Sequence, residues 1–170
     1  MNEKAKELLG KAKYDFADLC RVMEILRGEG GCPWDREQTH ESIRKNFIEE
    51  TYEVVEAIDT KDAHLLCEEL GDVLLQVVFH TQIEREAGRF TIDDVTDGIV
   101  KKLIYRHPHI FADTTAETAE TVLDNWDKLK AKEKHRDTVT ASMRSVPRPL
   151  PALMRAEKVG KRAAKVGFDF

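Results

Sequence analysis

A chain of 170 residues with a net charge of −5 is long enough for one domain with its own core. It contains no apolar run near the roughly 20 residues that span a bilayer, and its start, MNEKAKELLGKAK, has no signal-peptide core, so we expect a cytoplasmic protein that does not bind membranes. Its three cysteines, Cys20, Cys32 and Cys67, include no CxxC pair, which argues against a disulfide framework and a structural zinc site.

The charge is unevenly distributed along the chain. Residues 136–170 carry a net charge of +5, which leaves −10 for residues 1–135. An acidic body is a poor partner for nucleic acid, because binding to phosphates requires clustered Lys and Arg. We therefore expect one acidic domain, 1–135, followed by a basic segment, 136–170, that contains Pro147, Pro149 and Pro151. An acidic body that handles a polyanion needs metal ions between the two.

Helical periodicity dominates the sequence and predicts an all-α fold. Taken in chain order, the expected helices cover about 14–27, 39–59, 62–86, 91–105, 114–134 and 153–166. Thr39 is a suitable N-cap for the second helix, and Thr91 to Asp94 has the form of a capping box for the fourth. Gly28 to Asp35 is expected to form a loop, and the segment His107-Pro108-His109 to end the fourth helix.

The second helix carries a stripe of carboxylates. On a helical wheel with Glu49 at zero, Glu53 falls near 40°, Glu56 near 340° and Glu50 near 100°. The apolar side chains fall at about 120–300° and are expected to form the core face: Ile43, Phe47, Ile48, Tyr52, Val54, Val55 and Ile58. Taken alone, this stripe is typical of a solvated acidic face.

The third helix favours a metal site over a solvated face. Its stretch from Leu65 to Phe79 is apolar on nearly all sides, yet Glu69 and Asp72 lie within about 60° of each other on it. Burying carboxylates is unfavourable unless their charge is compensated, and this stretch contains no Lys or Arg. Carboxylate oxygens without Cys or His suit Mg²⁺, with Mn²⁺ as an alternative. Two adjacent antiparallel helices would face such an ion from both sides.

Four motifs in order carry a resemblance to a known family. They are Gly31-Cys32-Pro33-Trp34-Asp35, Glu49-Glu50-Thr51-Tyr52-Glu53, Glu69-Leu70-Gly71-Asp72 and Arg106-His107-Pro108-His109-Ile110-Phe111. With them the chain resembles the MazG family of nucleoside triphosphate pyrophosphohydrolases over nearly its whole length. The resemblance implies a four-helix-bundle core, at least a homodimer, and Mg²⁺-dependent cleavage of a nucleoside triphosphate between its α- and β-phosphates. It implies metal ligands at Glu49, Glu50, Glu53, Glu69 and Asp72, with Glu68 as a further candidate.

The same resemblance suggests residues around the nucleotide. Lys102 and Arg106, one helical turn apart, resemble the basic pair that holds the phosphates, Trp126 resembles an aromatic lining position, and Glu68 lies beside the acidic set. The chain departs from this pattern at Asn46, which is flanked by Arg44 and Lys45 and stands where related domains place a phosphate-contacting Lys. A carboxylate not fully used as a ligand, Glu50 or Glu53, is expected to accept the proton of the attacking water.

The remaining tryptophan and histidine side chains of interest are expected to be structural, and two alternative functions stay open. Trp34 is expected to pack its loop, and His107 and His109 to form a turn. The other histidines are expected to be surface or helix residues without a chemical role: His40, His64, His80 and His135. The alternative function is a catalytically weak oligomerisation or regulatory module, because residues 150–170 resemble the connector of two-domain MazG proteins. Another is a narrow-specificity relative acting on dCTP, dUTP or phosphoribosyl-ATP. A P-loop ATPase is excluded, since the chain has no GxxxxGK[ST] motif.

Overall fold

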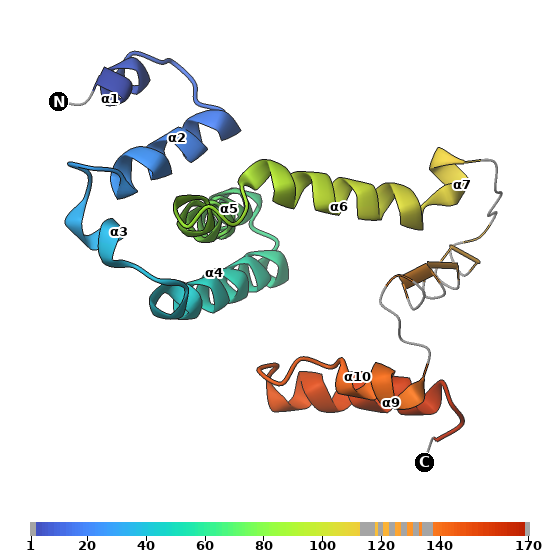
Figure 1. Cartoon of the computed structure of the whole chain (residues 1–170). Coiled ribbons are helices and arrows are strands. Elements are labelled where there is room, and N and C mark those ends of the chain that lie inside the picture. Colours follow the sequence, from blue (N-terminus) through green and yellow to red (C-terminus); the bar gives the residue numbers. More distant parts are fainter. Residues whose placement is uncertain are drawn as a thin grey trace. The chain divides into compact units, whose positions relative to one another are not determined.

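A computed structural model describes residues 3–112, 118, 121–122, 125–126, 129–130, 133 and 138–168. The chain forms two compact units, 1–97 and 98–170, which are described separately. Every regular element among the described residues is a helix, as Figure 1 shows. The prediction of an all-α fold is therefore confirmed. Within the described part of the chain, no helix is both long and apolar enough to cross a membrane.

The first unit contains α1 (Glu3–Leu9), α2 (Phe16–Arg27), α3 (Pro33–Glu37), α4 (His40–Thr60), α5 (Ala63–Glu86) and the first turns of α6 (Ile92–Arg106). The second unit contains the rest of α6, then α7 (Pro108–Phe111), α9 (Val139–Arg144) and α10 (Ala152–Ala164). The helix expected over 114–134 falls largely outside the described residues.

A tight reversal places α4 against α5, the pair that positions the site. Lys61 ends α4 in the left-handed region, with φ of 58°, and Asp62 caps α5 by accepting hydrogen bonds from the backbone N–H groups of His64 and Leu65. Because only this two-residue turn joins the helices, they run antiparallel and pack along each other. At the other end of α4, the Thr39 side chain accepts from the Ser42 N–H, as expected of an N-cap.

The core of the first unit lies where α2 and α4 meet α5. Met23, Ile43, Val78 and Phe79 form one buried cluster, and Met23 is only 1% exposed. Partly buried Leu19, Cys20, Leu75 and Ile83 pack around this cluster. The packing of α2 against α5 thus supports the helix that carries two of the predicted metal ligands.

Arg27 ties the end of α2 to two other parts of the unit. Its side chain is 6% exposed, and its guanidinium donates to the Glu86 carboxylate at 2.8–2.9 Å through Nε and one terminal nitrogen. The other terminal nitrogen donates to the backbone carbonyls of Asp35 and Gln38, and the guanidinium lies 5.3 Å from the ring centre of Phe79. One side chain therefore fixes α2, the α3–α4 connection and α5 together.

The loop expected between Gly28 and Asp35 is only partly a loop. Residues Pro33–Glu37 form the short helix α3, started by a proline at its first position, where the missing N–H costs nothing. Gly31 is required before it, because a Cβ there would lie 2.3 Å from the carbonyl oxygens of Ile25 and Leu26. Helix α1 was also not predicted, whereas the capping box at Thr91 and Asp94 is present as expected.

The predicted core face of α4 is correct for some of its apolar residues and wrong for the others. Ile43 is buried and Phe47 and Val54 are partly buried, but four other apolar side chains are 45–55% exposed: Ile48, Tyr52, Val55 and Ile58. The buried side is centred near Ile43 and Ala57, because α5 covers only that part of the apolar arc. Leu70 and Leu74 on α5 are also exposed.

Candidate functional site

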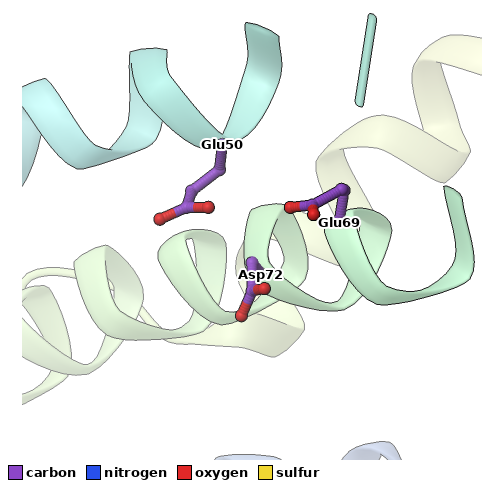
Figure 2. A group of neighbouring side chains, drawn as sticks. All are labelled: Glu50, Glu69 and Asp72. Atoms are coloured by element: carbon purple, nitrogen blue, oxygen red, sulfur yellow. The ribbon is translucent and has the colours of Figure 1, made fainter. Parts of the chain in front are cut away.

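Three carboxylates from α4 and α5 converge at the centre of the helix pair. One oxygen each from Glu50, Glu69 and Asp72 lies within 4.8 Å of the other two, and all three residues are partly buried. Figure 2 shows Glu50 reaching from α4 toward Glu69 and Asp72 on α5. The predicted approach of acidic residues from two antiparallel helices therefore appears in the geometry. We call these three residues the carboxylate cluster.

Helix geometry explains why these carboxylates meet. Glu69 and Asp72 are one turn apart on α5, so both project from the same side. Glu50 follows Ile43 by two turns on α4, and Ile43 is 2% exposed against α5. Glu50 therefore belongs to the packed side of α4, and the antiparallel arrangement brings it opposite the two acids of α5.

The cluster raises the pKa of two of its own members. Partial burial raises the pKa of Glu50 above its ordinary value, and the carboxylates of Glu53, Asp72 and Glu69 raise it further. Desolvation also raises the pKa of Glu69, followed by the charges of Glu53, Asp72 and Glu68. Each shift has the direction expected when like charges share a small volume without a cation between them.

Among the residues that the structure describes, no Lys, Arg or His forms an ion pair with Glu50, Glu69 or Asp72. Oxygens bound to Mg²⁺ lie about 2.1 Å from the ion and hence at most about 4.2 Å apart. The three carboxylate oxygens are already near this spacing. An oxygen-only donor set of this kind fits a hard divalent cation such as Mg²⁺ or Mn²⁺.

The remaining predicted acids lie around the cluster rather than within it. Glu53 is exposed and close enough to raise the pKa of both Glu50 and Glu69. Glu68 is exposed beside Glu69. Glu49 points to the solvated side, where Lys45 donates to it at 2.6 Å. Of the five predicted metal ligands, three are therefore brought together, Glu53 adjoins them, and Glu49 is engaged elsewhere.

The predicted phosphate-binding residues belong to the second unit. The Arg106 side chain is 6% exposed and donates to the Glu133 carboxylate at 2.7 and 2.8 Å. Its guanidinium lies 5.5 Å from the ring centre of Trp126, and the Lys130 ammonium lies 4.7 Å from the same ring. The predicted residues Arg106 and Trp126 are thus in contact. Lys102, one turn before Arg106 on α6, is partly buried.

The sequence interpretation missed a polar network at the far end of the α4–α5 pair. Nδ1 of His40 lies 2.7 Å from Nδ1 of His80, and Nε2 of His40 lies 2.5 Å from the Glu84 carboxylate, which also accepts from Arg89 at 2.5 and 2.7 Å. Burial, followed by the charge of His40, lowers the pKa of His80. The two histidines therefore join α4 to α5 instead of lying free on the surface. The i, i+4 spacing of His80 and Glu84 was the signal available in the sequence.

A cavity of about 290 Å³ lies away from the carboxylate cluster. It is lined by Cys20, Val78, Thr81, Gln82, Arg85, Thr91, Ile92 and Asp93. Arg85 is engaged by Glu24 at 3.0 Å, and none of the predicted site residues lines this cavity. The carboxylate cluster is therefore separate from this cavity.

Comparison with known proteins connects this geometry to a family. Residues 38–111 match the MazG nucleotide pyrophosphohydrolase domain. The chain is 48% identical over 153 residues to the nucleoside triphosphate pyrophosphohydrolase of Escherichia coli. The aligned residues make up 89% of this chain and 58% of that protein. The chain is 46% identical over 155 residues to the nucleoside triphosphate pyrophosphohydrolase/pyrophosphatase MazG of Thermotoga maritima, covering 91% and 59%.

A third relative is the nucleoside triphosphate pyrophosphohydrolase of Mycobacterium tuberculosis, 42% identical over 155 residues, which cover 90% of this chain and 46% of that protein. The chain thus spans between about half and three fifths of the length of these relatives. The matched segment 38–111 contains α4, α5 and α6, and with them all three members of the carboxylate cluster. The segment that carries this cluster is thus the segment that matches the MazG nucleotide pyrophosphohydrolase domain.

Proposed function

We propose that this chain hydrolyses nucleoside triphosphates to nucleoside monophosphate and pyrophosphate, using a divalent cation held by the carboxylate cluster. The observation that carries the proposal is the convergence of Glu50, Glu69 and Asp72 on one point, without an ion pair to any described cationic side chain. The named activities of the E. coli and T. maritima relatives support it. Mg²⁺ is the proposed ion, with Mn²⁺ able to replace it, because the donor set contains only oxygen.

The acidic residues divide into ligands and a base. A bound divalent cation supplies charge neutralisation for the triphosphate and lowers the pKa of a water molecule. Glu50 from α4 and Glu69 and Asp72 from α5 would hold this ion. Glu53 adjoins Glu50 and Glu69 but remains exposed, so it is the carboxylate best placed to accept a proton from water. Glu49 joins the site only after it gives up its surface pair with Lys45.

The basic residues of the second unit are proposed to hold the phosphates. Lys102 and Arg106 lie one turn apart on α6, a spacing that presents two cations from one helix face. Glu133 and the ring of Trp126 order the Arg106 guanidinium, and its N–H groups that Glu133 does not use are the ones proposed to donate to phosphate oxygens. Trp126 then lines the nucleotide site.

The activity is tested with a panel of ribo- and deoxyribonucleoside triphosphates in the presence of Mg²⁺, with products separated by anion exchange. The proposal predicts nucleoside monophosphate and pyrophosphate in equal amounts, and no turnover in EDTA. Production of nucleoside diphosphate and phosphate would contradict the proposed bond cleavage. A folded protein that is inactive on the whole panel would favour the alternative of an oligomerisation or regulatory module.

We also propose that the chain forms at least a homodimer, in which a second copy covers the apolar side of α4 and α5. Ile48, Tyr52, Val55 and Ile58 on α4 are each about half exposed, as are Leu70 and Leu74 on α5. An exposed apolar face of this width favours association between copies. Light scattering at micromolar concentration should give at least twice the 19.5 kDa chain mass. A monomer at that concentration would refute the proposed assembly.

A further inference from the structure

Gln76 on α5 has a buried carbonyl oxygen without a partner. The residue is only 7% exposed, and its Oε1 accepts no hydrogen bond from the part of the chain that the structure describes. Folded proteins pair nearly all buried polar atoms, so an unpaired buried amide oxygen requires an explanation. The apolar alternatives at this position, such as Leu or Met, would avoid the desolvation of the amide altogether.

The position of Gln76 relates it to the carboxylate cluster. It follows Asp72 by four residues and Glu69 by seven, so all three lie within about 60° on one face of α5. Side chains four residues apart on a helix have Cβ atoms about 5–6 Å apart. Phe79 and Ile83 continue the same face into the apolar core. Gln76 therefore lies between the carboxylates and the core, at the inner end of the site.

We propose that Oε1 of Gln76 accepts a hydrogen bond from a water molecule that hydrates the cation in the carboxylate cluster. This inference rests on the proposed function, because it requires a cation at Glu50, Glu69 and Asp72. Mg²⁺ keeps several of its waters when proteins bind it, and each of these waters needs acceptors for its two protons. A neutral amide supplies an acceptor on the core side without adding a fourth negative charge to the cluster. Gln76 is thus a positioning residue that fixes the hydration shell of the ion.

The two possible roles of Gln76, support of a bound ion and support of the fold alone, predict opposite effects of its replacement on the melting temperature of the metal-free protein. If Gln76 stabilised the fold by itself, its replacement by the apolar residue of similar length, Gln76→Met, would lower the melting temperature of the metal-free protein. If its oxygen is unpaired until an ion and its waters are present, Gln76→Met keeps or raises that melting temperature, because the cost of an unpaired buried acceptor disappears. The metal-free melting temperature therefore separates the two roles without reference to activity.

Gln82 offers a matched control on the same helix. It is also buried, at 9% exposed, but its Nε2 donates to the Glu86 carboxylate at 3.0 Å. It lies ten residues beyond Asp72, about 15 Å along the helix axis. Gln82→Met should lower the metal-free melting temperature, since a paired amide is lost, and should leave the affinity for Mn²⁺ unchanged.

The experiment combines thermal melts in EDTA with calorimetric titration of Mn²⁺ into the wild type, Gln76→Met, Gln76→Glu and Gln82→Met, with circular dichroism to verify the helical fold of each. We expect Gln76→Met to weaken Mn²⁺ binding about ten- to a hundredfold, as loss of residues that support metal ligands does, with no loss of metal-free stability. Gln76→Glu restores an acceptor, so it should recover Mn²⁺ binding while melting at lower temperature without metal, because a fourth carboxylate joins the cluster.

Wild-type affinity for Mn²⁺ in the Gln76→Met protein would overturn the inference, and so would a lower metal-free melting temperature. A wild type that binds no Mn²⁺ would refute the proposed metal site itself and the inference with it. Binding by the wild type with no response to Gln76→Met would refute only the role of Gln76.

Discussion

Replacing Asp72 by asparagine separates two effects of the carboxylate cluster: its repulsion, which destabilises the metal-free protein, and its binding of a cation, which stabilises the protein. Asp72→Asn keeps the shape of the side chain but removes one of three charges that lie within 4.8 Å of one another. Without metal, the variant should melt at a higher temperature than the wild type, because two of the three like-charge contacts in the cluster are relieved. With metal, the order should reverse, because one of three protein ligands is missing.

The expected size of the metal effect follows from binding linkage. At a free Mn²⁺ concentration a hundred times the dissociation constant, binding stabilises the wild type by about 2.7 kcal/mol. For a chain of this length, each 1 kcal/mol changes the melting temperature by about 2–4 °C, so the wild type should gain about 5–10 °C. If Asp72→Asn weakens binding about a hundredfold, the same Mn²⁺ concentration adds only about 0.4 kcal/mol, or about 1–2 °C.

The assay is differential scanning fluorimetry in low salt, with EDTA or Mn²⁺, on the wild type, Asp72→Asn and Asp59→Asn. Asp59 is an exposed acid on α4 away from the cluster, so its neutralisation should leave the response to Mn²⁺ unchanged. A lower metal-free melting temperature for Asp72→Asn would refute the reasoning, since it would mean that Asp72 pairs with a basic group. A full Mn²⁺ response in that variant would refute its part as a ligand.

Three further predictions concern the frame that holds the site. Met23→Ala removes a side chain that is 1% exposed and should lower the free energy of unfolding in urea by about 2–4 kcal/mol; a loss below about 1 kcal/mol would contradict the assigned core. Arg27→Met should lower the free energy of unfolding by about 2–3 kcal/mol, which is less than for a fully buried ion pair, because Glu86 is 37% exposed and can be hydrated. Glu86→Gln should lower it by less than Arg27→Met does. Arg89 holds the pKa of Glu84 at about 2, below its ordinary 4.5, so the stability that this carboxylate provides above pH 4.5 should be lost as the pH falls toward 2. Glu84→Gln should flatten urea unfolding midpoints over that range, and an unchanged pH profile would show that the network does not control acid stability.

The parts of the fold that local chemistry determines were accessible from the sequence. The caps at Thr39 and Thr91 each involve only four consecutive residues, and both are present where they were expected. The ends of the helices now called α4 and α5 were predicted to within one or two residues. The short helix α3 was missed, because a single turn begun by Pro33 has too few residues to show a helical period.

The packed side of α4 required knowledge of its neighbour. The apolar arc of this helix extends over about half its circumference, wider than α5 covers. Periodicity could not show which part of the arc would be buried, and so it placed Glu50 at the edge of the packed side rather than on it. The family resemblance gave Glu49 and Glu50 equal parts as ligands. In the structure Glu49 pairs with Lys45, and Glu50 lies with the two carboxylates of α5.

Polar contacts between residues far apart in the sequence could not be predicted from the pattern of any single helix. His40 and Glu84 are 44 residues apart and meet only because α4 and α5 are antiparallel and of similar length. Gln76 was hidden in an apolar stretch, where its sequence context gave it no distinguishing feature. Only the three-dimensional structure shows that its side-chain oxygen is buried without a hydrogen-bond partner among the described residues.

Direct binding of a divalent cation tests the central claim most closely. Free Mn²⁺ is measured by electron paramagnetic resonance during titration of the wild type and of the double variant Glu50→Gln, Asp72→Asn, which keeps one of the three converging carboxylates. The account predicts saturable binding to the wild type and a loss of affinity of at least about a hundredfold in the double variant. Equal binding by the two proteins, or none by the wild type, would contradict the assignment of the α4–α5 carboxylate cluster as a metal site.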